Sequence, residues 1–181
     1  MAKNNYRAAL IPVIIFIGLL FLLRAGLNHD PRALPTELAG QPVPEFSLNE
    51  LLTQQQVSNA DLPEGPYLLN VWGTWCASCY IEHPFLVELA KNKTIDIVGI
   101  NHKDDRDAAI AYLKKYEDPF VMNLFDPKGR MGINLGVYGA PETFLVGKDG
   151  QIKYRHVGVL DERVWQEKFV PLLGQTVDGD S

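Results

Sequence analysis

An unbroken apolar run near the N-terminus is the first feature of the hydrophobic pattern. Sixteen residues between Arg7 and Arg24, AALIPVIIFIGLLFLL, carry no charge. A helix rises about 1.5 Å per residue, so this run alone is short for a hydrocarbon core of about 30 Å. The flanking arginine side chains can reach outward to the headgroups, and residues 25–27 extend the apolar segment. The run therefore predicts a signal-anchor helix that contacts a membrane through residues 8–27.

Two alternatives remain for this run. The apolar region of a cleaved signal peptide usually has about 7–15 residues, but ELAG at 37–40 places the bulky Leu38 where cleavage prefers a small residue. A buried core helix fits poorly, because this helix would be apolar on all sides. Lys3 and Arg7 precede the run, and the positive-inside tendency keeps that end in the cytoplasm. We therefore expect the rest of the chain to be exported.

Residues after the apolar run show a change of pattern. NHDPRALPTELAGQ, at 28–41, has no sustained hydrophobic period and contains two prolines, which is typical of a tether. The predicted organisation is a cytoplasmic stub and signal-anchor helix (1–24), a linker (25–41), a folded domain (42–175) and a flexible tail (176–181).

Short apolar runs and amphipathic segments alternate through the domain. PYLLNVW at 66–72 is typical of a strand buried on both faces. Ile81, Phe85 and Leu89 then recur every four residues and predict a helix, which the apolar pattern carries through Pro84. IDIVGIN at 95–101 predicts a second buried strand, so the three segments predict a right-handed βαβ unit.

The second half of the domain continues this alternation with an inserted helix and strand and then a ββα unit. Together the segments predict a mixed α/β sheet with helices on both faces. The inserted elements are a helix in KDDRDAAIAYLKKY, with Ala109, Ile110 and Leu113 inward, and a strand in FVMNLF. A turn and a short helix follow in DPKGRMGINLGVYG, and then a hairpin of ETFLVG and QIKYRHV through KDG. The last element is a helix in DERVWQEKFVPLL, with Val164, Trp165, Phe169 and Leu172 inward.

Charge narrows the possible partners. The net charge is −5, and the first 24 residues carry Lys3, Arg7 and Arg24 without an acid, so the remainder is more acidic still. Nucleic-acid binding needs clustered basic residues, so we expect no nucleic-acid partner.

Cys76 and Cys79 are the only cysteines in the chain. A structural zinc site needs about four ligands, and adding His83 would leave the set one short. Haem attachment requires histidine directly after the second cysteine, where this sequence has Tyr80. We therefore expect no metal and no cofactor.

A purely structural disulfide is a further alternative in an exported protein, but so small a loop constrains the unfolded chain little. Redox exchange explains the spacing better. Cys76 is expected at a helix N-terminus, where unpaired N–H groups and the macrodipole favour the thiolate, so it should be the nucleophile. Cys79, one turn inside, should be more buried and should resolve the mixed disulfide.

These motifs resemble a known family. NVWGTWCASC, with Pro84 five residues after Cys79, and GVYGAPETFLV resemble the thioredoxin fold. More narrowly, together with PVPEFSL, HKDD, LFDPKG, YRHVG and VW, they resemble the membrane-anchored CcmG (DsbE) proteins of bacterial cytochrome c maturation. The resemblance extends over nearly the whole chain and makes 42–175 a thioredoxin-like domain.

The resemblance implies roles for residues outside the cysteine pair. Pro141 matches a cis-proline that lies opposite the pair and presents backbone to a substrate peptide. Glu82 and Glu142 match acidic residues of a groove by the cysteines. Ordinary thioredoxins have a buried aspartate where this chain has Asn70, so Glu82 would handle protons; the alternative for Glu82 is a solvated helix residue. Trp75, directly before the nucleophile, should shield it.

Two sites in this sequence differ from the usual pattern of the family. Ala77-Ser78 stands where proline commonly follows the first cysteine, which affects the redox potential. Tyr80 replaces a residue that is often basic, which should raise the pKa of the Cys76 thiol. Trp72 is expected in the core, and His83 and His156 are expected to be structural.

The resemblance implies a thiol–disulfide oxidoreductase tethered to the bacterial inner membrane, with its linker and domain in the periplasm. It would reduce the CxxCH cysteines of apocytochrome c for haem attachment, with cytochrome c maturation proteins as partners and a membrane electron donor of the DsbD or CcdA type. Three alternatives stay open: a reductase for copper-site assembly or other exported thiols, an oxidant that introduces disulfides, and a non-catalytic module that binds apocytochrome.

Overall fold

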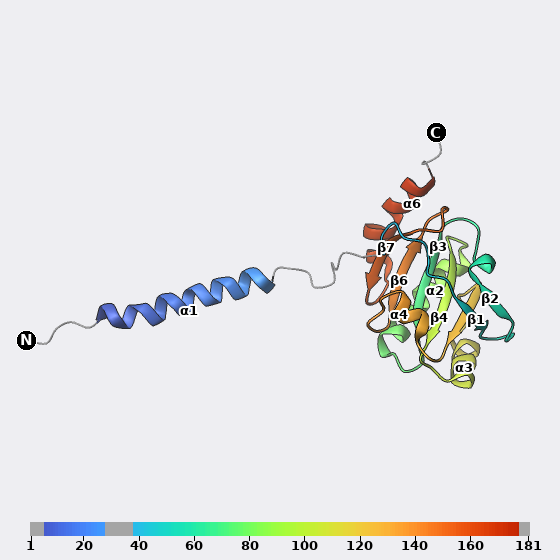
Figure 1. Cartoon of the computed structure of the whole chain (residues 1–181), viewed down its shortest axis with the longest axis horizontal. Helices are drawn as coiled ribbons and strands as arrows, with labels where there is room; N and C mark the ends of the chain where they lie inside the picture. Colours follow the sequence, from blue (N-terminus) through green and yellow to red (C-terminus); the bar gives the residue numbers. More distant parts are fainter. Residues whose placement is uncertain (1–5, 28–37, 178–181) are drawn as a thin grey trace, which may run out of the picture. The chain divides into compact units, whose positions relative to one another are not determined.

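The computed structural model describes residues 6–27 and 38–177, which belong to two compact units, Met1–Leu34 and Pro35–Ser181. The first contains helix α1 (Tyr6–Leu27) (Figure 1). Within the described residues, no helix combines the length and the apolar character needed to cross a membrane. The structure therefore does not show the predicted anchor. The predicted stub, linker and tail lie partly outside the described residues.

The second unit contains one sheet of seven strands in the order β2-β1-β5-β4-β3-β6-β7. The central strands β3, β4 and β5 are parallel, and the flanking strands pair antiparallel. The mixed α/β sheet expected from the sequence is thus confirmed. The strands are β1 (Ser47–Glu50), β2 (Gln56–Ser58), β3 (Tyr67–Trp72), β4 (Asp96–His102), β5 (Met122–Asp126), β6 (Glu142–Val146) and β7 (Ile152–Val157).

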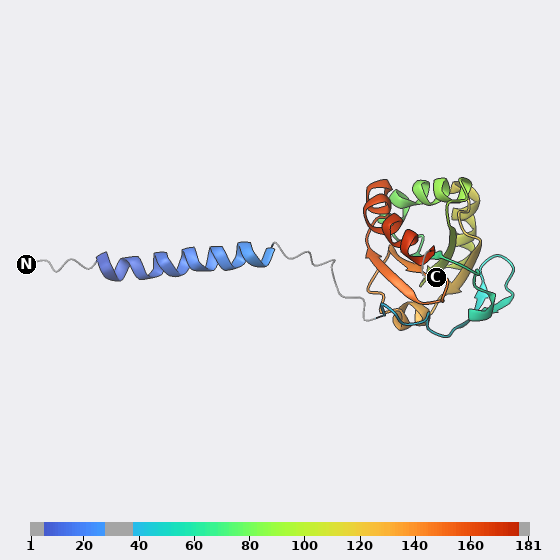
Figure 2. The same ribbon diagram turned by 90° about the horizontal axis from the view of Figure 1, so that it is seen from above.

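Helices cover both faces of this sheet, as predicted. Figure 2 shows α2, in green, and α4, in orange, on opposite sides of the strands. The helical segments of this unit are η1 (Asn59–Asp61), α2 (Ala77–Lys91), α3 (Arg106–Tyr116), α4 (Arg130–Asn134), α5 (Glu162–Val164), the π-helical segment Trp165–Phe169 and α6 (Val170–Val177).

Strand β3 joins the cores of the two faces, because all six of its side chains are buried. Side chains of a strand alternate between faces. Val71 accordingly packs in the same cluster as Met131 of α4, whereas Leu68 packs with Leu86 of α2 and with Phe169. The strand leads directly into the cysteine pair and so connects the sheet to the site.

Most predicted elements are confirmed, but not every apolar position of the patterns faces inward: Ile81 of α2 is 69% exposed, and Leu172 is only partly buried. The buried strand, the helix that continues past Pro84 and the next strand form the predicted βαβ unit. Ala109 and Leu113 of α3 are buried, whereas Ile110 is only partly buried and Tyr112 takes an inward position instead. The β6–β7 hairpin is also confirmed.

Strands β1 and β2 and the π-helical segment are elements that the sequence pattern did not predict. The two strands have four and three residues, and their side chains are exposed or only partly buried. Strands this short and exposed show little alternation of apolar and polar residues, which is the signal that predicts a strand.

Candidate active site at the start of helix α2

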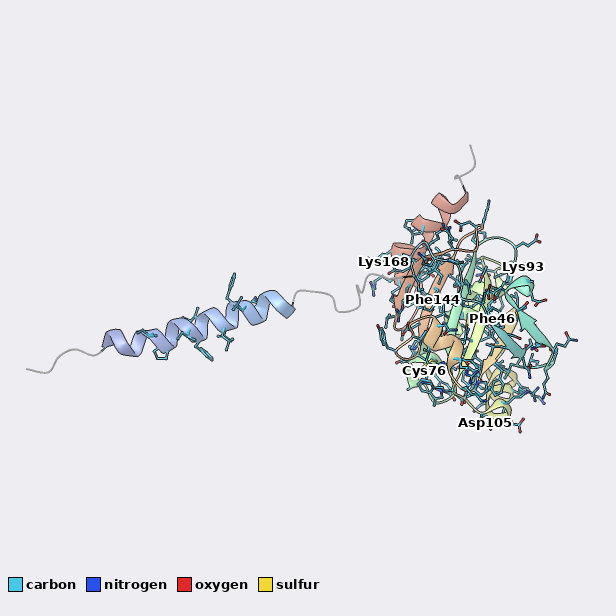
Figure 3. The ribbon with its side chains drawn as sticks, in the orientation of Figure 1. Phe46, Cys76, Lys93, Asp105, Phe144 and Lys168 are labelled. Atoms are coloured by element: carbon cyan, nitrogen blue, oxygen red, sulfur yellow. A yellow bond between two sulfur atoms is a disulfide. The ribbon has the colours of Figure 1, made fainter. Side chains whose placement is uncertain are left out.

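Cys76, labelled in Figure 3, and Cys79 form a disulfide at the N-terminus of α2. Cys76 is the N-cap residue, and the backbone N–H of Cys79 donates to the Cys76 sulfur at 3.1 Å. This is the helix position expected from the sequence. An N–H group aimed at the sulfur, together with the positive end of the helix dipole, stabilises a thiolate on Cys76 once the disulfide is reduced.

Burial does not separate the two cysteines, contrary to the sequence expectation. Cys76 is 4% exposed and Cys79 is 3% exposed. The bridge holds both sulfur atoms in one apolar cluster, where they pack with Trp72 and Tyr112. The predicted assignment of Cys76 as nucleophile therefore depends on its place at the helix N-terminus, not on its exposure in the oxidised form.

A turn between Gly73 and Cys76 connects β3 to the helix. The N–H of Cys76 donates to the Gly73 carbonyl at 3.1 Å. Trp75 is 52% exposed, and its indole N–H donates to the carbonyl of His102 at 2.9 Å. A Cβ at position 73 would lie 2.5 Å from the indole nitrogen, so the glycine allows the ring to lie against the turn. The shielding predicted for Trp75 stays a prediction.

Pro141 lies next to this turn, at the start of β6. The Ala140–Pro141 peptide bond is cis, as the resemblance implies. Val71 pairs with Glu142 across β3 and β6, so Pro141 is level with Trp72, at the end of the strand that leads into the turn. The sheet thus brings the cis-proline to the same end as the disulfide, although the two are far apart in sequence.

Glu82 is buried beneath the pair and connects three elements. Its carboxylate accepts hydrogen bonds from Asn70 Nδ2 and from the N–H of Leu160, both at 2.9 Å. Asn70 Nδ2 also donates to Thr143 Oγ1 at 3.0 Å. The alternative of a solvated Glu82 is wrong, because the side chain is 1% exposed.

The environment of Glu82 favours its neutral form. Burial raises the pKa of Glu82 to about 7, and the hydrogen bonds from Leu160 and Asn70 oppose this rise only in part. Glu82 follows Cys79 by three residues in α2, so the two side chains lie on one face of the helix. A carboxyl group with this pKa can take up or release a proton near neutral pH.

Glu142 does not share an acidic groove with Glu82. In the β3–β6 register Thr143 is opposite Asn70, on the face that Glu82 contacts, whereas Glu142 is opposite Val71 on the other face. Glu142 is also 1% exposed. The resemblance implied one groove that contains both Glu82 and Glu142. This prediction is wrong, because adjacent residues of a strand face opposite sides of the sheet.

Glu142 forms a buried salt bridge with Arg155. The Nε and Nη2 atoms of Arg155 donate to Glu142 Oε2 at 2.8 and 2.6 Å, and Nη2 also donates to the Gly136 carbonyl at 2.8 Å. Glu142 Oε1 accepts from the N–H of Tyr138 at 3.0 Å. The ion pair thus ties together the segment that leads to Pro141, a role that the motif YRHVG did not reveal by itself.

His83 and His156, the two histidines for which a structural role was expected, are each held by a main-chain carbonyl group. His83 Nε2 lies 2.9 Å from the Glu117 carbonyl, and His156 Nε2 lies 3.1 Å from the Val159 carbonyl. His83 also meets the ring of Tyr112 edge to face. These contacts agree with the structural role expected for both residues.

Comparison with known proteins places this geometry in a family. Residues 38–169 match the family model described as Redoxin. The chain is 46% identical over 173 residues to the thiol:disulfide interchange protein DsbE of Escherichia coli K12, covering 92% of this chain and 93% of the relative. It is 45% identical over 170 residues to DsbE of Pseudomonas aeruginosa, covering 93% and 94%.

Solved structures show the same fold. A Neisseria meningitidis protein assigned to the thioredoxins superimposes with a TM-score of 0.63 at 30% identity, covering 76% of this chain and 93% of that one. A thio-disulfide isomerase from Thermus thermophilus gives 0.62 at 24% identity, covering 75% and 96%. With its disulfide at the start of α2, the chain is therefore a member of the Redoxin family and, within it, a thiol–disulfide oxidoreductase of the DsbE group.

Proposed function

We propose that this protein reduces the CxxCH cysteines of apocytochrome c in the bacterial periplasm, so that haem can be attached. The observation that carries the reductase assignment is the disulfide at the N-terminus of α2 with Glu82, whose pKa is about 7, buried behind it. Support for the apocytochrome substrate comes from the likeness to DsbE proteins and from the motifs that resemble the CcmG family.

The reaction is a pair of thiol–disulfide exchanges. The Cys76 thiolate attacks one sulfur of the substrate disulfide, which forms a mixed disulfide and releases the other substrate sulfur as a thiolate. The Cys79 thiolate then attacks Cys76, which releases the second substrate sulfur. Substrate gains two electrons and two protons, and Cys76 and Cys79 end as the disulfide present in the structure.

Glu82 provides a base for the second exchange. Cys79 must lose its proton before it can attack, and the Glu82 carboxylate lies on the same helix face one turn further on. With a pKa of about 7, Glu82 is partly ionised at neutral pH and can accept that proton. The cis peptide bond before Pro141 would present backbone groups to the substrate beside Cys76.

The oxidised product must be reduced again before another turnover. A periplasm kept oxidising would leave the disulfide in place, so we propose a membrane electron donor of the DsbD or CcdA type. The apolar run between Arg7 and Arg24 supports a single inner-membrane anchor with the domain in the periplasm. Resistance of the full chain to extraction from membranes at alkaline pH would support the anchor, and release into the soluble fraction would contradict it.

Trapping in cells tests the substrate. In a Cys79→Ser protein the mixed disulfide on Cys76 has no resolving thiol and should accumulate. We expect mass spectrometry of the trapped species to identify apocytochrome c, and a Cys76→Ser protein to trap nothing and to support no cytochrome c production. Trapping of copper-site proteins without cytochromes would instead favour the alternative reductase.

A further inference from the structure

The end of strand β4 holds the turn that leads into Cys76. Asp104 receives two donors from Thr74: the backbone N–H reaches Oδ2 at 2.6 Å, and the hydroxyl reaches Oδ1 at 2.6 Å. The Trp75 indole donates to the carbonyl of His102. Residues 102–104 therefore accept three hydrogen bonds from Thr74 and Trp75, the two residues that precede Cys76.

Further contacts hold the Asp104 carboxylate in its position. Asn101 Nδ2 donates to Oδ2 at 2.9 Å, and the N–H of Asp105 donates to Oδ1 at 2.9 Å. With the two donors of Thr74, each carboxylate oxygen accepts two hydrogen bonds. A carboxylate is an acceptor on both oxygens, so these four donors match it and lie around its negative charge beside the turn.

Cations next to Asp104 in sequence contact other elements. Arg106 Nη2 donates to the carbonyl of Leu52 at 3.0 Å, and the side chain of Lys103 lies against Gly129. Among the ion pairs found in residues 38–177, none involves Asp104. Within these residues the Asp104 carboxylate therefore has hydrogen-bond donors as its partners and no salt bridge.

Asp104 lies close enough to affect Cys76. The α-carbons of Thr74 and Cys76, two residues apart, can be separated by at most about 7.6 Å. The hydrogen bond from the Cys76 N–H to Gly73 closes the turn further. The path from Asp104 through Thr74, the Gly73 carbonyl and the Cys76 N–H to the sulfur keeps the carboxylate within about 11 Å of the nucleophile, and its charge opposes the positive end of α2.

We propose that Asp104 is a positioning residue that fixes the Gly73–Cys76 turn and, through its charge, makes the reduced cysteine pair a stronger reductant. In the disulfide Cys76 is neutral, whereas in the reduced protein a Cys76 thiolate is negative. A nearby negative charge raises the free energy of the reduced form alone, which lowers the redox potential. The proposal rests on the reductase function proposed above, because it explains how the site keeps reducing character.

The test is the redox potential of purified full-length protein, measured by equilibration with glutathione at pH 8. A unit charge at about 10 Å in a high effective dielectric changes an equilibrium constant about two- to fourfold. We expect Asp104→Asn to shift the equilibrium about threefold toward the reduced protein, which corresponds to a potential about 14 mV less negative. Asp104→Glu, which keeps the charge, should stay near the wild-type potential.

Asp105→Asn is the matched control. It removes the same charge from the next residue, but the Asp105 carboxylate caps α3 through the N–H of Ala108 at 2.9 Å and does not contact Thr74. The Asp105 side chain is exposed to solvent, which screens its charge, so we expect a shift clearly smaller than that of Asp104→Asn. Asp104→Ser serves as a second neutral variant if Asp104→Asn does not fold.

Equal potentials for Asp104→Asn, Asp105→Asn and the wild type would overturn the proposal, as would a shift toward a more negative potential in the Asp104 variant. The measurement uses no cytochrome. A shifted potential in a protein that fails to reduce apocytochrome c would therefore support this proposal while contradicting the proposed function.

Discussion

Glu82 should make the stability of the protein fall as the pH rises from acid to neutral. The folded chain holds this carboxyl group among buried side chains, where burial raises its pKa from 4.5 to about 7. Glu82→Gln removes the titrating group while preserving the size of the side chain. Comparison of the two proteins across pH therefore isolates the contribution of this one group.

The sign and size of the effect follow from the two pKa values. Below pH 4.5 Glu82 is protonated in both the folded and the unfolded chain. Between pH 4.5 and about 7 the unfolded chain releases the proton while the folded chain retains it, so the free energy of unfolding decreases with pH. A tenfold change in acidity is worth about 1.4 kcal/mol, so the wild type should lose about 3 kcal/mol relative to Glu82→Gln.

Urea unfolding of both oxidised proteins at a series of pH values between 4 and 8 measures this difference. The glutamine amide cannot accept from both Asn70 and Leu160, which adds a cost that is the same at every pH. Other titrating groups are common to both proteins and cancel in the comparison. Parallel stability curves through this range would refute the reasoning, because they would mean that Glu82 titrates alike in the folded and unfolded chain.

Three further changes probe other parts of the structure. Arg155→Ala leaves Glu142 buried without its partner and should lower the free energy of unfolding by about 3–5 kcal/mol in urea titrations; a loss below 1 kcal/mol would show that the pair is not needed. Asn70→Asp places a second carboxyl group beside Glu82 and should raise its pKa above the present value of about 7, seen by NMR titration; an unchanged or lower pKa would contradict this. Phe169→Ala empties a fully buried position and should cost about 3–5 kcal/mol, and an unchanged unfolding midpoint would argue against its place in the core.

The parts of the fold that were predictable have strong local patterns. The strand ending at Trp72 is buried on both faces and reads as a nearly continuous apolar run. The four-residue spacing of Ile81, Phe85 and Leu89 predicted α2, although Ile81 lies on the exposed side of the helix. Strands β1 and β2 could not be predicted, because they are short and half exposed. The strand β2 pairs with β1, and β1 pairs with β5 from a distant part of the chain, which a local stretch of sequence does not reveal.

The site was predictable as a set of residues but not as an arrangement. Glu82, Asn70 and Glu142 were all expected near the cysteines, yet which of them touch depends on strand register. A difference of one position puts Thr143 on the Asn70 side and Glu142 on the opposite face. The sequence showed Asp104 only as part of the motif HKDD. Its contact with Thr74 could not be predicted, because the two residues are 30 positions apart in the sequence.

Reaction of the reduced full-length protein with an oxidised CxxCH peptide tests the central claim most directly, with intact mass as the readout. The account predicts that the wild type reduces the peptide and becomes the Cys76–Cys79 disulfide, whereas Cys79→Ser stops as an adduct on Cys76 and Cys76→Ser forms no adduct. An adduct on Cys79 that forms in the Cys76→Ser protein as fast as the Cys76 adduct forms in Cys79→Ser would contradict the assigned roles.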